Sequence, residues 1–181
     1  MTKKVLALTL FILAFIERVF FDLGPNTELV TFAMILSAAY LGRTESLGLT
    51  FLIMAVTDLV IGNTNIFIFT WSGFLIPAFL SGTIFRTFKV RGIKKVGLGT
   101  ISAIGANLFF FFWTNFGVWL VGSMYPKTLG GLTTSYINGL PFLNMQLLST
   151  ILFVPLGFFL FEAAHLLKKS PNFGKFALSF K

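Results

Sequence analysis

The sequence contains no cysteine and only one histidine, His165. The absence of cysteine excludes disulfides and thiolate metal sites. A lone histidine without a neighbouring carboxylate cluster is a poor metal ligand and a poor catalyst, so we expect a structural role for His165. No metal and no cofactor are therefore predicted.

Charge is also scarce, since only 11% of the 181 residues are charged and 56% are hydrophobic, with 25 phenylalanines. Soluble domains carry about a quarter charged residues. A chain this apolar must leave part of its surface to lipid. The composition predicts an all-α integral membrane protein.

The motifs of common enzymes are missing from the sequence. It has no G-x-x-x-x-G-K-[ST] loop for nucleotide phosphates, no H-E-x-x-H and no G-x-S-x-G. We therefore predict that the chain is not an enzyme and does not itself hold ATP. The net charge of +8 raises the possibility of nucleic-acid binding, but basic residues flanking membrane helices explain it better.

Six apolar segments predict six transmembrane helices in one domain, residues 1–170, followed by a short basic tail, 171–181. The second and third are short for a membrane crossing, and a polar, glycine-rich loop from Gly122 to Pro141 is expected before the sixth. The segments are Val5–Phe21, Leu29–Leu41, Leu47–Ile61, Ile66–Phe85, Val96–Val121 and Phe142–Leu167.

The basic residues alternate with these segments. Six helices would place 12 of the 14 on one side of the membrane and leave Arg18 and Lys127 on the other. Because basic residues concentrate on the cytoplasmic side, both termini are predicted to be cytoplasmic. The twelve are Lys3, Lys4, Arg43, Arg86, Lys89, Arg91, Lys94, Lys95, Lys168, Lys169, Lys175 and Lys181.

Two polar positions in the outer half are candidates for ligand binding. Asn115 and Trp119 are four residues apart and share a helix face, and Asn115 lies about 10 Å below the helix end. It binds either a ligand or a neighbouring helix. Asp58, near the outer end of the third segment, marks a functional site or simply pairs with Arg18.

Aromatic and polar residues gather on the same side. Aromatic belts at the membrane interface account for individual tryptophans and tyrosines, but aromatic walls with a few polar groups are also typical of small-molecule sites. We expect Asp58, Asn115, Trp119, Tyr125 and Lys127 to converge on one cavity. The full set of candidate ligand-binding residues is Arg18, Asn26, Asp58, Trp71, Asn115, Trp119, Tyr125, Lys127 and Tyr136.

Small residues four apart allow close helix packing, within the chain or against a partner. Such pairs are Ala33 and Ser37, Ala38 and Gly42, Gly99 and Ala103, and Ser102 and Ala106.

Three stretches resemble a family of uncharacterised bacterial membrane proteins grouped with the substrate-binding S components of energy-coupling-factor transporters. They are TNFGVWLVGSMYPKTLGGLTTSYINGLPF, NTELVTFAMILSAAYLGR and TDLVIG. The resemblance implies a six-helix subunit that captures a small molecule, such as a vitamin, in an outward-facing pocket. It also implies a location in the bacterial inner membrane and partners, a transmembrane coupling protein and two ATPase subunits. One departure is the lack of Ala-x-x-x-Ala in the first segment, where Ala7 and Ala14 are seven apart.

A structural function is the alternative. Membrane scaffold proteins resembling the rod-shape family also have about six helices and bind no small molecule. They need partner-facing patches rather than a polar pocket, so the polar residues on the outer side favour substrate binding. The residues leave the substrate open, because Asp58 and Glu17 suit a cation, whereas Arg18 and Lys127 suit a carboxylate or phosphate.

Overall fold

The structure, a computed structural model, describes residues 2–21 and 29–169, with side chains up to residue 164. These residues form six helices and no strand, which confirms the predicted all-α fold. The helices are α1 (Lys3–Phe20), α2 (Val30–Tyr40), α3 (Arg43–Ile61), α4 (Phe67–Phe88), α5 (Ile93–Val121) and α6 (Leu129–Lys169).

Four of these helices, α3 to α6, are long and apolar enough to cross a membrane. The apolar surface supports this assignment, because Leu59 is 86% exposed and Ile101 is 69% exposed. α2 has only 11 residues, and α1 carries Lys3, Lys4, Glu17 and Arg18 within 18 residues. The chain thus has the helices of a membrane protein. Of the other two helices, α2 is too short and α1 too charged to be counted as a simple membrane span.

The prediction for the sixth segment is wrong at its start. α6 begins at Leu129, not at Phe142, so the expected long loop shrinks to residues 122–128. The reason is that the glycines serve helix packing. A Cβ on Gly131 would meet the Pro126 carbonyl, and a Cβ on Gly139 would lie 2.5 Å from Asn115 Oδ1.

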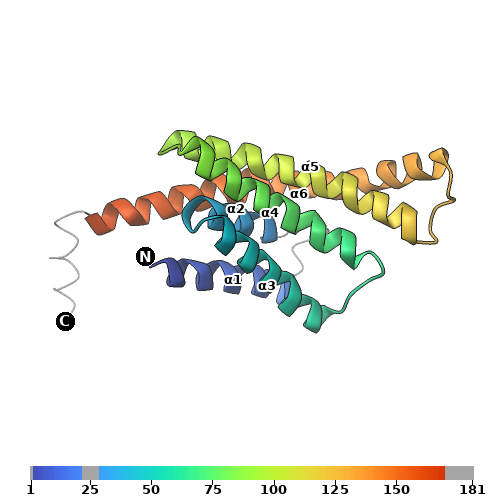
Figure 1. The fold of residues 1–181 in the computed structure, drawn as a ribbon, viewed down its shortest axis with the longest axis horizontal. Helices are drawn as coiled ribbons and strands as arrows, with labels where there is room; N and C mark the ends of the chain where they lie inside the picture. The colour runs from blue at the N-terminus through green and yellow to red at the C-terminus, as the bar shows by residue number, and fades with distance from the viewer. Residues whose placement is uncertain (1, 22–28, 170–181) are drawn as a thin grey trace.

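α2 lies at the centre of the bundle and contacts every other helix. Its residues Ala33 to Ala38 are all buried. α1 packs on α2 and α3, while α5 and α6 form a long antiparallel hairpin beside α4 (Figure 1). Most of the core therefore forms around the shortest helix. Among the largest fully buried side chains of the core are Leu10, Met34, Ile53, Phe74 and Phe158.

The two ends of the bundle differ in charge. The start of α1, the α2–α3 and α4–α5 turns and the end of α6 lie at the left in Figure 1, and the α3–α4 and α5–α6 turns lie at the right. The left end carries ten of the basic residues from the list above, as far as Lys169. We call it the basic end, and the right end the opposite end.

Small residues let the helices approach within the chain. Gly99 packs against the ring of Phe158, where an added Cβ would lie 2.3 Å from the ring. Its partner in sequence, Ala103, is fully buried. Gly82 sits against the backbone of Arg43. The Gly99–Ala103 pair therefore packs α5 on α6.

Candidate functional site

An ion pair joins α1 to α3 at the opposite end of the bundle. Arg18, in the last turn of α1, donates from Nη2 to Asp58 Oδ1 at 2.9 Å. The second carboxylate oxygen, Oδ2, accepts a hydrogen bond of 2.6 Å from Trp71 Nε1 on α4. Both side chains are largely buried, with exposed fractions of 15% for Arg18 and 5% for Asp58. The pair is thus a three-helix junction in which both oxygens of Asp58 have donors.

The preceding residue fixes the end of α1. Glu17 is buried, and its Oε2 accepts a hydrogen bond of 2.9 Å from the backbone N–H of Leu29. Leu29 is the N-cap of α2, a position whose following amides need acceptors. Glu17 therefore ties the end of α1 to the start of α2, and positions Arg18 beside it.

A cavity of about 420 Å³ opens beside this junction. It lies between the ends of α1, α4, α5 and α6, and its volume is in the range of small-molecule sites. The described residues that line it are Arg18, Ile66, Thr70, Phe74, Phe110, Thr114, Asn115, Val118 and Phe142.

The neutral polar groups of the cavity use their hydrogens within their own helices. Thr70 donates to the Ile66 carbonyl at 3.4 Å, and Thr114 donates to the Phe110 carbonyl at 2.8 Å. The Asn115 amide nitrogen donates to the Phe111 carbonyl at 2.8 Å. The two threonines can therefore offer a ligand only their oxygens as acceptors, whereas the Asn115 amide has both an acceptor oxygen and a second N–H.

Asn115 has a second role in helix packing. Its side chain lies against Gly139 of α6, and its backbone carbonyl accepts a hydrogen bond of 3.0 Å from Ser135. The sequence left open whether Asn115 faces a ligand or a helix. In the structure it lines the cavity and also packs against α6.

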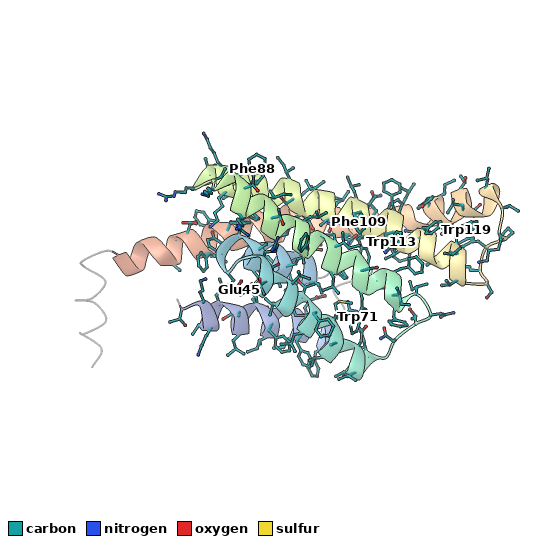
Figure 2. The ribbon with its side chains drawn as sticks, viewed as in Figure 1. Glu45, Trp71, Phe88, Phe109, Trp113 and Trp119 are labelled. Carbon is teal, nitrogen blue, oxygen red and sulfur yellow. The ribbon has the colours of Figure 1, made fainter. Side chains whose placement is uncertain are left out.

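The other candidates on α5 and in the turn form a separate cluster. Trp119 donates to the Pro126 carbonyl at 3.0 Å. Lys127 Nζ donates to the carbonyls of Trp119 and Gly122, and Asn138 donates to the Tyr125 hydroxyl at 3.2 Å. These contacts cap the C-terminus of α5, where a cation is favoured by the helix dipole. Figure 2 shows Trp119 close to the α5–α6 turn and Trp71 well apart from it.

The expected convergence of five side chains on one cavity is therefore not seen. Asn115 lines the cavity. Asp58 is not among the lining residues but binds Arg18, which is. Trp119, Tyr125 and Lys127 belong to the turn.

Tyr136 is not among the described residues that line the cavity. Tyr136 packs on the rings of Phe111 and Phe112 and donates to the Phe112 carbonyl. Asn26 lies outside the described residues. Ligand binding by any of the nine candidates stays a prediction.

Sequence reasoning missed Thr70, Thr114, Phe74 and Phe110, which also line the cavity. A signal was present for two of them, because Phe110 and Thr114 are four residues apart and Thr114 adjoins Asn115. Thr70 and Phe74 show the same spacing on α4.

A buried polar layer lies deeper in the bundle. Asn107 is fully buried. Its oxygen accepts from Thr31 on α2 at 3.1 Å, and its nitrogen donates to Thr150 Oγ1 at 2.7 Å and to the Gln146 carbonyl at 3.2 Å, both on α6. Asn107 thus has a structural role, linking α2, α5 and α6.

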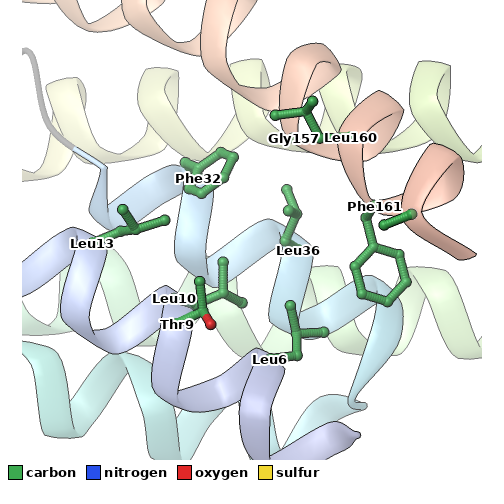
Figure 3. A pocket seen from close by; sticks show the side chains of 10 residues that line it. Leu6, Thr9, Leu10, Leu13, Phe32, Leu36, Gly157, Leu160 and Phe161 are labelled. Carbon is green, nitrogen blue, oxygen red and sulfur yellow. The ribbon is translucent and has the colours of Figure 1, made fainter. Parts of the chain in front are cut away.

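A second hollow, between α1, α2 and α6, has a different character. Its volume is about 210 Å³ and its lining is apolar apart from Thr9. Figure 3 shows Leu10 and Leu13 of α1 facing Phe32 and Leu36 of α2, with Phe161 of α6 at one side. The described residues of this groove include no charged group with which to orient a polar ligand.

The chain matches, over residues 1–173, the model of a family of unknown function, DUF6580. The chain belongs to this family. No curated protein and no solved structure is significantly similar to it. The matched residues include all six helices and the lining of the cavity. Because the function of the family is unknown, a functional proposal for this chain rests on the geometry of the site.

In the described part of the chain, no group of three or more His, Asp or Glu side chains comes together. The two buried carboxylates are engaged by Arg18, Trp71 and the Leu29 amide.

Proposed function

We propose that this DUF6580 protein is the substrate-binding membrane subunit of an importer of the energy-coupling-factor type. It captures a small molecule in the cavity beside Arg18. The observation that carries the proposal is the lining of this cavity, which combines one cation, three acceptor side chains and aromatic walls. Such a mixture suits a partly polar ligand.

The lack of a nucleotide-binding loop supports the second half of the proposal. A chain that imports against a gradient without its own ATP site needs energy from partners. A transmembrane coupling protein and two ATPase subunits would supply it, as the resemblance to S components implies.

The orientation of the subunit follows from the charge of its two ends. We place the basic end in the cytoplasm and the cavity at the outer face. The chain has no native cysteine, so single cysteines can report this directly. Thr133→Cys should react with an impermeant thiol reagent on intact cells and Lys94→Cys should not. The reverse pattern would invert the orientation.

Ligand capture can be tested by mass spectrometry of small molecules retained after mild purification in nanodiscs. Val118 lines the cavity, and Val121, in the same turn of α5, is 45% exposed. Val118→Trp should fill the cavity and remove the retained molecule, whereas Val121→Trp should keep it. A wild-type protein that retains no small molecule would contradict capture.

Copurification tests the partners. A coupling protein with two ATPases is expected to accompany the tagged chain from its native membrane. Recovery of cell-wall assembly proteins instead would favour the scaffold function.

A further inference from the structure

The charges around the cavity narrow the class of ligand. Arg18 is the only charged side chain among the described residues of the lining. The two nearby carboxylates are not among the described residues of the lining. Asp58 binds Arg18 and Trp71, and Glu17 accepts from the Leu29 amide. Lys127 lies in the α5–α6 turn. Of the charged groups that the sequence offered for a substrate, only a cation faces the cavity.

Two residues that are not among the described lining hold the Arg18 guanidinium in position. Asp58 accepts one of its N–H groups, and Trp71 in turn holds Asp58. A guanidinium carries five N–H donors in a rigid plane and matches a carboxylate well. Asp58 and Trp71 are thus positioning residues, which hold the cation in place without touching the cavity.

The walls of the cavity suit a flat ring. Phe74 and Phe110 pack with ring centroids 4.5 Å apart, and Phe142 lines the cavity from α6. The Phe142 ring, at 45% exposure, can stack on a planar ring, and Phe74 and Phe110, which are largely buried, add apolar wall beside it. The hydroxyl oxygens of Thr70 and Thr114 are placed to accept from a ring N–H or hydroxyl.

We propose that the cavity binds a small aromatic or heteroaromatic monocarboxylate. Its carboxylate binds Arg18 and its ring packs among Phe74, Phe110 and Phe142. This inference rests on the proposed function, since it names the substrate class of the same site.

A matched panel tests the class. Purified wild-type protein in nanodiscs is titrated by calorimetry with benzoate, pyridine-carboxylates and indole-carboxylates, each beside its primary amide. The amide keeps the ring and removes the charge. At least one acid should bind about 10- to 100-fold more tightly than its amide, as expected for loss of a charge-assisted hydrogen bond.

The variants assign this preference to Arg18. Arg18→Gln alone leaves Asp58 buried without its cation, so the main variant is the double substitution Arg18→Gln with Asp58→Asn, which removes both charges. It should fold, as judged by size-exclusion and thermal unfolding, and lose the preference for acids. Thr83→Ala, far from the cavity on α4, is the control and should keep it.

Three results would overturn the inference. They are equal binding of acids and amides, no binding of any acid in the panel, and an acid preference that survives in the folded double variant. Mass spectrometry of the retained small molecules distinguishes a failure of the monocarboxylate inference from a failure of the proposed function. A neutral or cationic molecule that is retained by wild type and lost in Val118→Trp would contradict the monocarboxylate and keep substrate capture.

Discussion

Arg18 and Asp58 lie 40 residues apart in the sequence, and their side chains meet at 2.9 Å at the ends of α1 and α3. α1 carries four charged residues and packs only on α2 and α3 among the described helices. The ion pair is therefore a main polar link between α1 and the rest of the bundle, and it lies at the rim of the cavity.

Removing the charge of Asp58 should destabilise the protein. Asp58→Asn keeps the shape of the side chain but removes the negative charge that faces a largely buried guanidinium, which costs on the order of 3 kcal/mol. Thermal unfolding in detergent, followed by tryptophan fluorescence, should show a clearly lower midpoint. Glu45→Gln, at an exposed position, should leave the midpoint unchanged. A midpoint for Asp58→Asn equal to wild type would mean that the pair contributes nothing.

Asn107 should be a second point of sensitivity. Asn107→Ala removes hydrogen bonds to Thr31, Thr150 and the Gln146 carbonyl. Hydrogen bonds between membrane helices contribute about 0.6 kcal/mol each, so a total loss of about 2 kcal/mol is expected. Unfolding by SDS measures it. Asn144→Ala, at an exposed position on α6, is the control, and equal curves for the two variants would argue against the three-helix link.

Two glycines of α5 should respond to alanine with opposite signs. An added Cβ on Gly99 would lie 2.3 Å from the Phe158 ring, whereas Gly105 has nothing within 4 Å. Gly99→Ala should lower the unfolding midpoint because the ring cannot move away easily in a packed core. Gly105→Ala should be neutral or stabilising by up to about 1 kcal/mol, through reduced freedom of the unfolded chain. A stabilising Gly99→Ala would show that α5 and α6 pack less closely than described.

Gln146 offers an unusual stabilising substitution. Its side chain is 1% exposed, and neither amide atom has a hydrogen-bond partner among the described residues. Such atoms cost roughly 1 to 3 kcal/mol when buried without partners. Gln146→Leu keeps most of the volume and should raise the unfolding midpoint. A lowered midpoint would show that the amide has a partner in the folded protein.

Five helices were predictable because long apolar runs separated by short polar, charged or glycine-containing segments leave little choice. The predicted second segment, Leu29–Leu41, differs from α2 by one residue at each end. α6 was not predictable from local signals. Gly130, Gly131, Gly139 and Pro141 resemble loop residues, yet a close partner helix makes glycine favourable where a side chain would clash. Only the packing on Pro126 and Asn115 shows this.

The candidate site was predictable in part. A charged residue in an apolar helix must face protein or water. For Asp58 this left two alternatives, a functional site or an ion pair with Arg18, and the structure shows the ion pair. The sequence could not show which of them faces the cavity, because that depends on Trp71 approaching from α4. It also could not separate Lys127 from the site, since capping a helix end and binding an anion use the same ammonium group.

The length of α6 has a practical consequence. Its 41 residues correspond to about 61 Å, roughly twice the thickness of the bilayer hydrocarbon, and ordinary helix tilts do not absorb the difference. Figure 1 shows the α5–α6 turn extending beyond the α3–α4 turn. Trp119, Tyr125 and Lys127 hold this turn in one shape. An antibody fragment raised against it would bind a fixed epitope clear of the detergent belt, and would serve as a fiducial for electron microscopy of a 20.1 kDa chain.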